Sequence, residues 1–152
     1  LANTVVSKIG YLKHCQNCKH RKVENLKDQN LVCEICGTKC MLVGPLWIDN
    51  LFDSVFVSAM LNELKNNENY SSSTKDYHRL LRMMQTCDKE LAYPYYFETD
   101  TIAALAKRSS ISLDIVVSTL SDSGFKVSKT IMNPKGFKTN ASQKEIINFL
   151  YK

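Results

Sequence analysis

Apolar residues recur at helical spacing through the middle of the chain, after a first third that lacks this pattern. Residues 1–47 show no helical periodicity. After Asp49, apolar side chains follow at intervals that suit one helix face, at Leu51, Phe52, Val55, Phe56, Ala59, Met60 and Leu64. We expect a helix capped by Asp49, and its broad apolar stripe predicts that other elements bury it. A second helix is expected to begin at a capping box of Ser73 and Asp76 and to end before Pro94.

The last third alternates between short helices and two candidate strands. Three residues are suited to begin helices, namely Asp100, Ser112 and Ser142, with Glu145 completing a capping box for the last. Gly124 suits the left-handed position that ends the middle helix. Residues 125–128 and 137–139 are expected to form strands on either side of a turn at 133–136. Two helices followed by a two-stranded ribbon is the order of a winged-helix unit.

The composition is that of an ordinary folded chain with a small positive excess. Of the 152 residues, 44% are hydrophobic and 23% are charged, which excludes wholesale disorder. No uncharged apolar run approaches the roughly 20 residues of a membrane helix, so no membrane partner is expected. The 20 basic and 15 acidic residues leave a formal charge of +5, which permits contact with phosphate without indicating it.

No signal peptide is visible at the start of the chain, which begins with Leu1 rather than methionine. We therefore expect a fragment of a longer protein from a reducing, intracellular compartment, with nucleus, cytoplasm and mitochondrion left open. In such a compartment, clustered cysteines indicate a metal site more often than disulfides.

The strongest chemical signal is a double Cys-x-x-Cys pattern. Its four cysteines are Cys15, Cys18, Cys33 and Cys36, with Gly37 directly after the second pair. Each pair supplies two thiolates to one edge of a tetrahedron, so the pattern predicts a structural Zn²⁺ site closed by four protein ligands. A redox dithiol is the alternative. Nearby Cys40, His14 and His20 are expected to lie around the site without binding the metal, and Cys87 to be a core thiol.

Motifs for nucleotide, phosphate or acyl chemistry are absent, since no Gly-rich loop, P-loop or nucleophile elbow occurs. No catalytic residue is therefore predicted. Candidate contacts to RNA phosphates are the basic residues of the cysteine loop, the second helix and the ribbon: Lys19, Arg21, Lys22, Arg79, Arg82, Lys126, Lys129, Lys135 and Lys138.

Several motifs, taken in order, resemble the C-terminal region of the tRNA (guanine-26-N2)-dimethyltransferases. After the second cysteine pair comes Gly-Pro-Leu-Trp at 44–47, and an acidic-Leu pair at 90–91 precedes Pro-Tyr-Tyr at 94–96. The sequence Gly-Phe-Lys-Val-Ser at 124–128 and Lys-Thr-Asn-Ala at 138–141 complete the pattern. The resemblance covers nearly the whole chain.

This resemblance implies a tRNA-binding, zinc-containing domain of an enzyme that transfers methyl groups from S-adenosylmethionine to a guanine N2. The family's cofactor domain is a separate N-terminal unit, which these residues do not contain. The chain would then position tRNA for that methyltransferase domain of the same polypeptide and be inactive alone.

We therefore expect an α+β fold in three segments. A zinc knuckle or ribbon at 1–47 would pack on a helical body at 48–97, followed by a winged-helix-like unit at 98–152. The alternative function is a zinc-ribbon and winged-helix module that binds DNA or protein in transcription.

Overall fold

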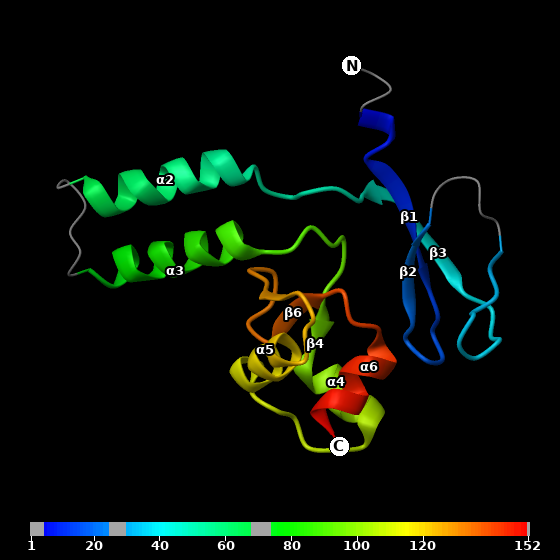
Figure 1. The fold of residues 1–152 in the computed structure, drawn as a ribbon. Helices are drawn as coiled ribbons and strands as arrows, with labels where there is room; N and C mark the ends of the chain where they lie inside the picture. The colour runs from blue at the N-terminus through cyan, green and yellow to red at the C-terminus, as the bar shows by residue number, and fades with distance from the viewer. Residues whose placement is uncertain (1–4, 25–29, 68–73, 152) are drawn as a thin grey trace. The chain divides into compact units, whose positions relative to one another are not determined.

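The computed structural model describes residues 5–24, 30–67 and 74–151. The chain divides into two compact units, residues 1–49 and 50–152. The named helices all lie in the second unit and both units contain strands, so the described chain has an α+β fold (Figure 1). The division into three segments stays a prediction.

The first unit is a three-stranded antiparallel sheet with the order β2-β1-β3. Its strands are β1 (Ile9–His14), β2 (Arg21–Glu24) and β3 (Met41–Trp47). The first Cys-x-x-Cys turn connects β1 to β2. The second lies just before β3, where a single bridge pairs Val32 with Lys39. The sheet therefore carries both turns on its connections.

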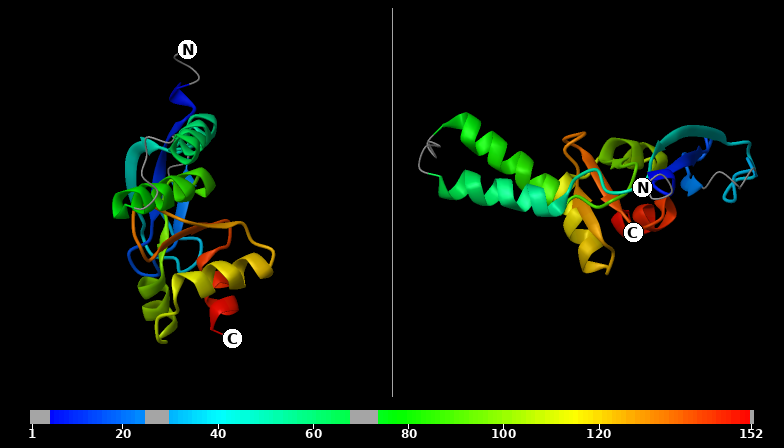
Figure 2. Two further views of the ribbon diagram at one scale, coloured as in Figure 1. Left: turned by 90° about the vertical axis from the view of Figure 1, so that its left-hand side faces the viewer. Right: turned by 90° about the horizontal axis from the view of Figure 1, so that it is seen from above.

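The second unit begins with two antiparallel helices, α2 (Ser54–Asn66) and α3 (Lys75–Lys89), which lie side by side in both views of Figure 2. Their contact is a small core of four buried residues, Val57, Leu61, Leu64 and Met84.

The remainder of the second unit packs around one apolar core. Strands β4 (Phe97–Glu98), β5 (Val127–Lys129) and β6 (Gly136–Thr139) form an antiparallel sheet with the order β4-β6-β5. Helices α4 (Thr99–Ala106), α5 (Leu113–Asp122) and α6 (Gln143–Leu150) pack with it. The fully buried centre of the core consists of Ile102, Val116, Leu120, Phe137, Ala141 and Ile146.

Helix termini in the last third follow the predicted caps. Ser112 accepts from the Ile115 amide, and Ser142 with Glu145 forms a complete capping box. Gly124 has φ +86°, the left-handed conformation expected there.

Three other caps differ from the sequence-based expectation. Helix α2 begins after Asp53 rather than Asp49, because the Asp53 carboxylate accepts from the Phe56 amide. Thr74 caps α3, and the predicted cap Ser73 lies outside the described residues. Helix α4 begins at Thr99, one residue before the predicted cap Asp100.

The expected burial of α2 on most of its surface is wrong. Val55, Phe56 and Met60 are 79%, 65% and 43% exposed. Within the second unit only the face of α2 toward α3 is covered, because these two helices form a simple hairpin.

None of the helices in the described ranges is both long enough and apolar enough to span a bilayer.

Candidate metal centre and nucleic-acid interface

The two Cys-x-x-Cys turns have the same backbone geometry. In the first turn, the Cys15 carbonyl accepts a hydrogen bond from the Lys19 amide, and in the second the Cys33 carbonyl accepts one from the Gly37 amide. Both bonds are 2.9 Å long. Lys19 and Gly37 are left-handed, with φ +60° and +70°. The Cys15 amide donates to the His20 carbonyl, and in the same way the Cys33 amide donates to the Thr38 carbonyl. The repeated geometry turns two thiols inward from each loop.

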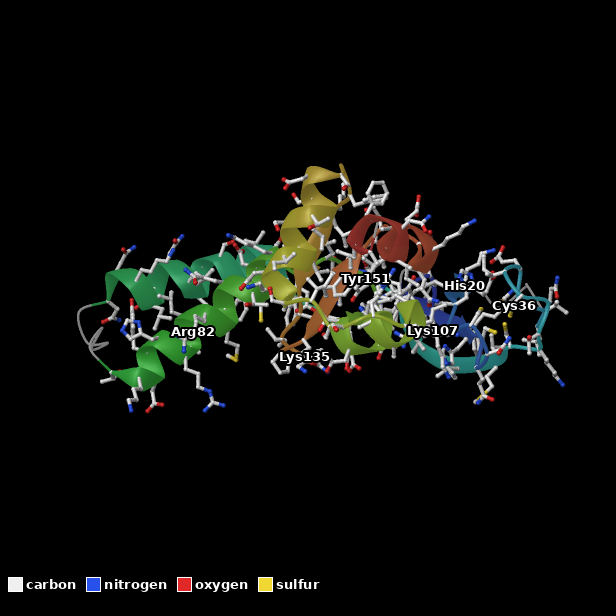
Figure 3. All side chains as sticks on the ribbon, turned by 90° about the horizontal axis from the view of Figure 1, so that it is seen from below. His20, Cys36, Arg82, Lys107, Lys135 and Tyr151 are labelled. Carbon is white, nitrogen blue, oxygen red and sulfur yellow. The ribbon has the colours of Figure 1, made fainter. Side chains whose placement is uncertain are left out.

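The four sulfur atoms of Cys15, Cys18, Cys33 and Cys36 meet within 4.8 Å of one another. The two cross-loop pairs, Cys15–Cys36 and Cys18–Cys33, are 3.5 and 3.6 Å apart. Sulfurs at about 2.3 Å from a tetrahedral zinc would be about 3.8 Å from each other. In Figure 3, sulfur atoms, drawn in yellow, lie near the labelled Cys36. The donor set and its spacing therefore fit one tetrahedral ion.

Without metal, the thiols of this cluster differ in acidity. Hydrogen bonds from the hydroxyl and amide of Thr38 lower the pKa of Cys36 to about 5. Burial raises the pKa of Cys18 to about 12. The pKa of Cys33 is lowered, although burial opposes the shift, because the amides of Ile35 and Cys36 hydrogen-bond to its sulfur. Backbone and Thr38 donors thus stabilise thiolate in the second turn, and a thiolate is the form that binds metal.

The other polar residues near the cluster lie beside it rather than in it. Cys40 is buried, and its sulfur is 4.0 Å from the Thr38 carbonyl oxygen. Burial raises the pKa of Cys40 and lowers that of His14. The His20 imidazole lies 3.5 Å from the Glu34 carboxylate. Among the described residues, the group that could hold a metal contains only the four predicted cysteines.

The predicted RNA-contacting residues of the first unit lie on or next to the first cysteine turn. Lys19 is exposed on the turn itself, and Arg21 is half-buried at the start of β2. The Lys22 ammonium, also exposed, is 3.5 Å from Glu24 and 3.2 Å from Glu34. These carboxylates reduce the charge that Lys22 offers to phosphate.

Most of the predicted basic residues of the second unit are on its surface. Arg79 and Arg82 are exposed on α3, and Lys126 is exposed just before β5. Two lysines of the ribbon have carboxylate partners: Lys129 lies 2.5 Å from Asp114, and Lys135 lies 2.6 Å from Asp100. Both ammonium groups remain about half exposed, so phosphate can compete for them.

Lys138 does not lie on the surface, and its predicted contact with RNA is wrong. Its side chain is 3% exposed and its ammonium is 2.9 Å from the Glu90 carboxylate, which is 1% exposed. Glu90 also accepts from the Thr130 hydroxyl and the Ile131 amide. The prediction treated 137–139 as one edge of a two-stranded ribbon. Because β4 adds a third strand, β6 is central and every residue of it is buried.

Sequence reasoning also missed a groove on α3. Three of its lining residues, Arg82, Gln85 and Lys89, follow one another on α3 at intervals of three and four residues. The cavity that they line has a volume of about 400 Å³. Helical spacing from Arg82 is the signal that could have found the other two residues.

The Gly-Pro-Leu-Trp motif belongs to β3 in the first unit. A Cβ atom on Gly44 would lie 2.8 Å from the Tyr11 ring and 3.0 Å from the Gly10 carbonyl oxygen. Gly44 also has φ +146°, and the bond to Pro45 is cis. Trp47 at the end of the strand has the Lys8 ammonium 5.5 Å from its ring centre. The motif therefore fits the close approach of β3 to β1.

Comparisons with known proteins agree on one family. The family profile described as "N2,N2-dimethylguanosine tRNA methyltransferase" matches residues 1–151. The tRNA (guanine(26)-N(2))-dimethyltransferase of Methanobrevibacter smithii is 34% identical over 141 residues, which are 91% of this chain and 35% of that protein. That of Methanothermobacter thermautotrophicus is 29% identical over 147 residues, 95% of this chain and 37% of the relative.

A solved structure has the same fold. It is described as Trm1 from Pyrococcus horikoshii in complex with S-adenosyl-L-methionine, and it aligns with a TM-score of 0.73 at 22% identity. The alignment covers 97% of this chain and 36% of that one. The chain thus spans little more than a third of the length of these proteins. Because the family profile matches almost every residue, the resemblance inferred from the motifs is confirmed, and the chain belongs to the N2,N2-dimethylguanosine tRNA methyltransferase family.

Proposed function

We propose that this chain is the tRNA-binding, zinc-containing part of a SAM-dependent tRNA (guanine-26-N2)-dimethyltransferase. The observation that carries the proposal is the family match over residues 1–151, joined to exposed basic side chains in both units. Phosphate contacts from such side chains position a nucleic acid without reading its sequence. The proposed contacts are Lys19, Arg21, Lys22, Arg79, Arg82, Lys126, Lys129 and Lys135.

The chemistry of methyl transfer would lie outside these residues. Since the chain spans 35% and 37% of the length of two relatives, the larger part of such a protein is elsewhere. We assign S-adenosylmethionine and catalysis to that N-terminal part of the polypeptide, with the present residues holding the tRNA.

The four cysteines would bind a structural Zn²⁺ and hold the two turns of the first unit together. The sulfur spacing supports this assignment, and a closed set of four protein ligands leaves no position for a substrate. Thiolate ligands need a reducing compartment, which we propose for this protein.

Residues 98–152 would form a winged-helix-like unit. Supporting this, β4, α4, α5, β5 and β6 follow one another in that order and the first strand pairs with the last. In winged helices that read DNA, the second helix of this unit enters the major groove. Here that helix is α5, which carries Asp114 and Asp122 and no basic residue. This charge disfavours the docking of α5 in the major groove of duplex DNA.

Competition between folded tRNA and duplex DNA of equal length tests the proposed function. Metal-loaded protein should bind the tRNA at least about tenfold more tightly at the same salt concentration, because α5 would repel a duplex that occupied the usual position. A preference for duplex DNA would overturn the assignment.

A further inference from the structure

A groove in the second unit lies between α3, α5 and β5. It encloses about 400 Å³, within the usual size range of small-ligand sites. All of its lining residues belong to one compact unit: Arg82, Gln85, Thr86, Lys89, Val117, Val127, Ser128 and Lys129. The groove is thus built by three elements that the fold holds together.

Helix α3 uses two different faces for packing and for the groove. Arg82, Gln85 and Lys89 share the face that lines the groove. Met84, on another face, is buried in the core between α2 and α3. The groove face is polar over two turns of helix, and α3 also contacts β5 on the other side of the groove.

The groove has a positive charge that its own residues do not neutralise. Among the described residues that line it, three are basic and none is acidic. Arg82 and Lys89 have no carboxylate within ion-pair distance in the described parts of the chain. Lys129 is paired with Asp114, whose side chain is 83% exposed, so this pair is weak and exchangeable.

The remaining lining residues provide an apolar wall and fixed hydroxyls. Val117 of α5 and Val127 of β5 are half-buried side chains in the groove. The Thr86 hydroxyl donates to the Arg82 carbonyl, and the Ser128 hydroxyl accepts from the Leu91 amide. Both hydroxyls are therefore held in place, and Arg82, Gln85 and Lys89 add further donors to the groove.

We propose that this groove binds one unpaired nucleotide of an RNA strand, with Arg82 and Lys89 on its phosphate and its ribose or base against Val117 and Val127. The inference rests on the proposed tRNA binding and deepens it. A hollow with an apolar wall suits a nucleotide turned out of a helix, whereas a paired backbone needs only a flat charged surface. Gln85 would supply donors and an acceptor to the base edge.

The first test uses nucleotides as probes on the metal-loaded chain, followed by NMR. Guanosine 5′-monophosphate should shift the signals of Gln85, Lys89, Val117 and Val127, and guanosine without phosphate should bind at least about tenfold more weakly. Inorganic phosphate alone should also bind more weakly than the nucleotide, because it leaves the apolar wall uncovered. The proposal would be overturned if the NMR shifts mapped to residues outside the groove. It would also be overturned if guanosine and guanosine 5′-monophosphate bound with equal affinity.

The second test compares two charge-matched double variants. R82Q/K89Q removes the two cations of the groove, and K75Q/K144Q removes two exposed lysines outside it. The groove variant should lose at least about tenfold in nucleotide affinity, and the slope of log affinity for tRNA against log salt should fall by about 1–2. The control variant should keep the nucleotide affinity within about twofold, and both should unfold at the wild-type temperature.

The two proposals can fail separately. If the groove variant binds both the nucleotide and tRNA as the control does, the groove inference is wrong and tRNA binding stands. If the wild-type chain binds no tRNA but the nucleotide still maps to the groove, the tRNA assignment is wrong and the nucleotide site stands.

Discussion

Glu90 and Lys138 join two motifs that are far apart in the sequence. Both belong to the family resemblance, Glu90 to the acidic-Leu pair and Lys138 to Lys-Thr-Asn-Ala, and Lys138 was also a candidate RNA contact. In the structure their side chains form a buried ion pair at 2.9 Å. The pair connects the end of α3 to the central strand β6, so both motifs have a structural role that spacing alone could not suggest.

Replacing one member of this pair should destabilise the second unit strongly. Lys138→Met leaves the buried Glu90 carboxylate without its cation, at a cost of about 3–5 kcal/mol. Adding Glu90→Gln should recover part of that loss, because the unpaired charge is gone and the amide oxygen can still accept from the Ile131 amide. Urea unfolding of the single and double variants measures both effects. A loss under about 0.5 kcal/mol for Lys138→Met would show that the pair is not buried as described.

Asp100 gives a prediction that depends on pH. Hydrogen bonds and charge from Lys135, together with the Ser110 hydroxyl, lower the pKa of its carboxyl group. The ionised Asp100 carboxylate therefore stabilises the folded protein at pH values above the carboxyl pKa of the unfolded chain, about 3.9. This stabilisation is lost as the pH falls through the lower pKa that Asp100 has in the folded protein. Carboxyl NMR titration should give a midpoint below about 3.9 for Asp100, and Lys135→Gln should raise it. A midpoint unchanged by Lys135→Gln would contradict the ion pair.

The two cysteine turns share one conformation but differ in the residue at the left-handed position. The second turn has Gly37, where a Cβ atom would meet nothing within 4 Å, and the first has Lys19. Any effect of substitution at these two positions should therefore come mainly from the backbone conformation.

Gly37→Ala should destabilise the metal-loaded first unit by about 1 kcal/mol, because a side chain is strained in this conformation. Lys19→Gly should change stability by less than about 0.5 kcal/mol, since relief of the same strain is offset by the greater freedom of glycine in the unfolded chain. Thermal unfolding with excess zinc measures both changes. Equal losses in the two variants would show that the turns do not share this geometry.

Elements defined by local signals were predicted well, and those defined by distant partners were not. A helix cap or a terminal glycine depends on only a few adjacent residues. Such residues are found where expected at Ser112, Gly124 and Ser142. The exposure of α2 and the central position of β6 depend on which elements pack nearby. Neither apolar periodicity nor strand alternation carries that information.

The same distinction holds for the candidate site: its locally defined residues were predicted, and those that depend on distant elements were not. The cysteines were found because ligand spacing is local, and their sulfurs do meet. Surface lysines were found from charge, but burial of Lys138 required knowledge of the third strand. The groove lies between α3, α5 and β5, so no single stretch of sequence could outline it.

At the scale of the whole molecule, a unit with a cysteine cluster that could hold a metal ion and a unit with an apolar core have different buried centres. The first unit's buried cluster consists of cysteines, with Cys15, Cys33 and Cys40 at its centre. The second has the apolar core around Phe137 and Leu120. Loss of metal should therefore affect the two units very differently.

Chelation of zinc should unfold the first unit and leave the second folded. Among its described residues, the first unit has few buried apolar side chains that could stabilise it without a metal ion, whereas the second unit has its own apolar core. Amide NMR spectra before and after chelation should lose the signals of the first unit only. Cys33→Ser should do the same without a chelator. A spectrum that chelation leaves unchanged would contradict the metal site. So would a protein that contains no zinc as purified and is nevertheless fully folded.

The most direct test of the central claim is the affinity of the metal-loaded chain for folded tRNA across a salt series. The account predicts binding that weakens steeply as salt rises, since each neutralised phosphate releases counterions, and that exceeds the affinity for duplex DNA at every salt concentration. No binding to tRNA at low salt, or equal affinity for duplex DNA throughout, would contradict it.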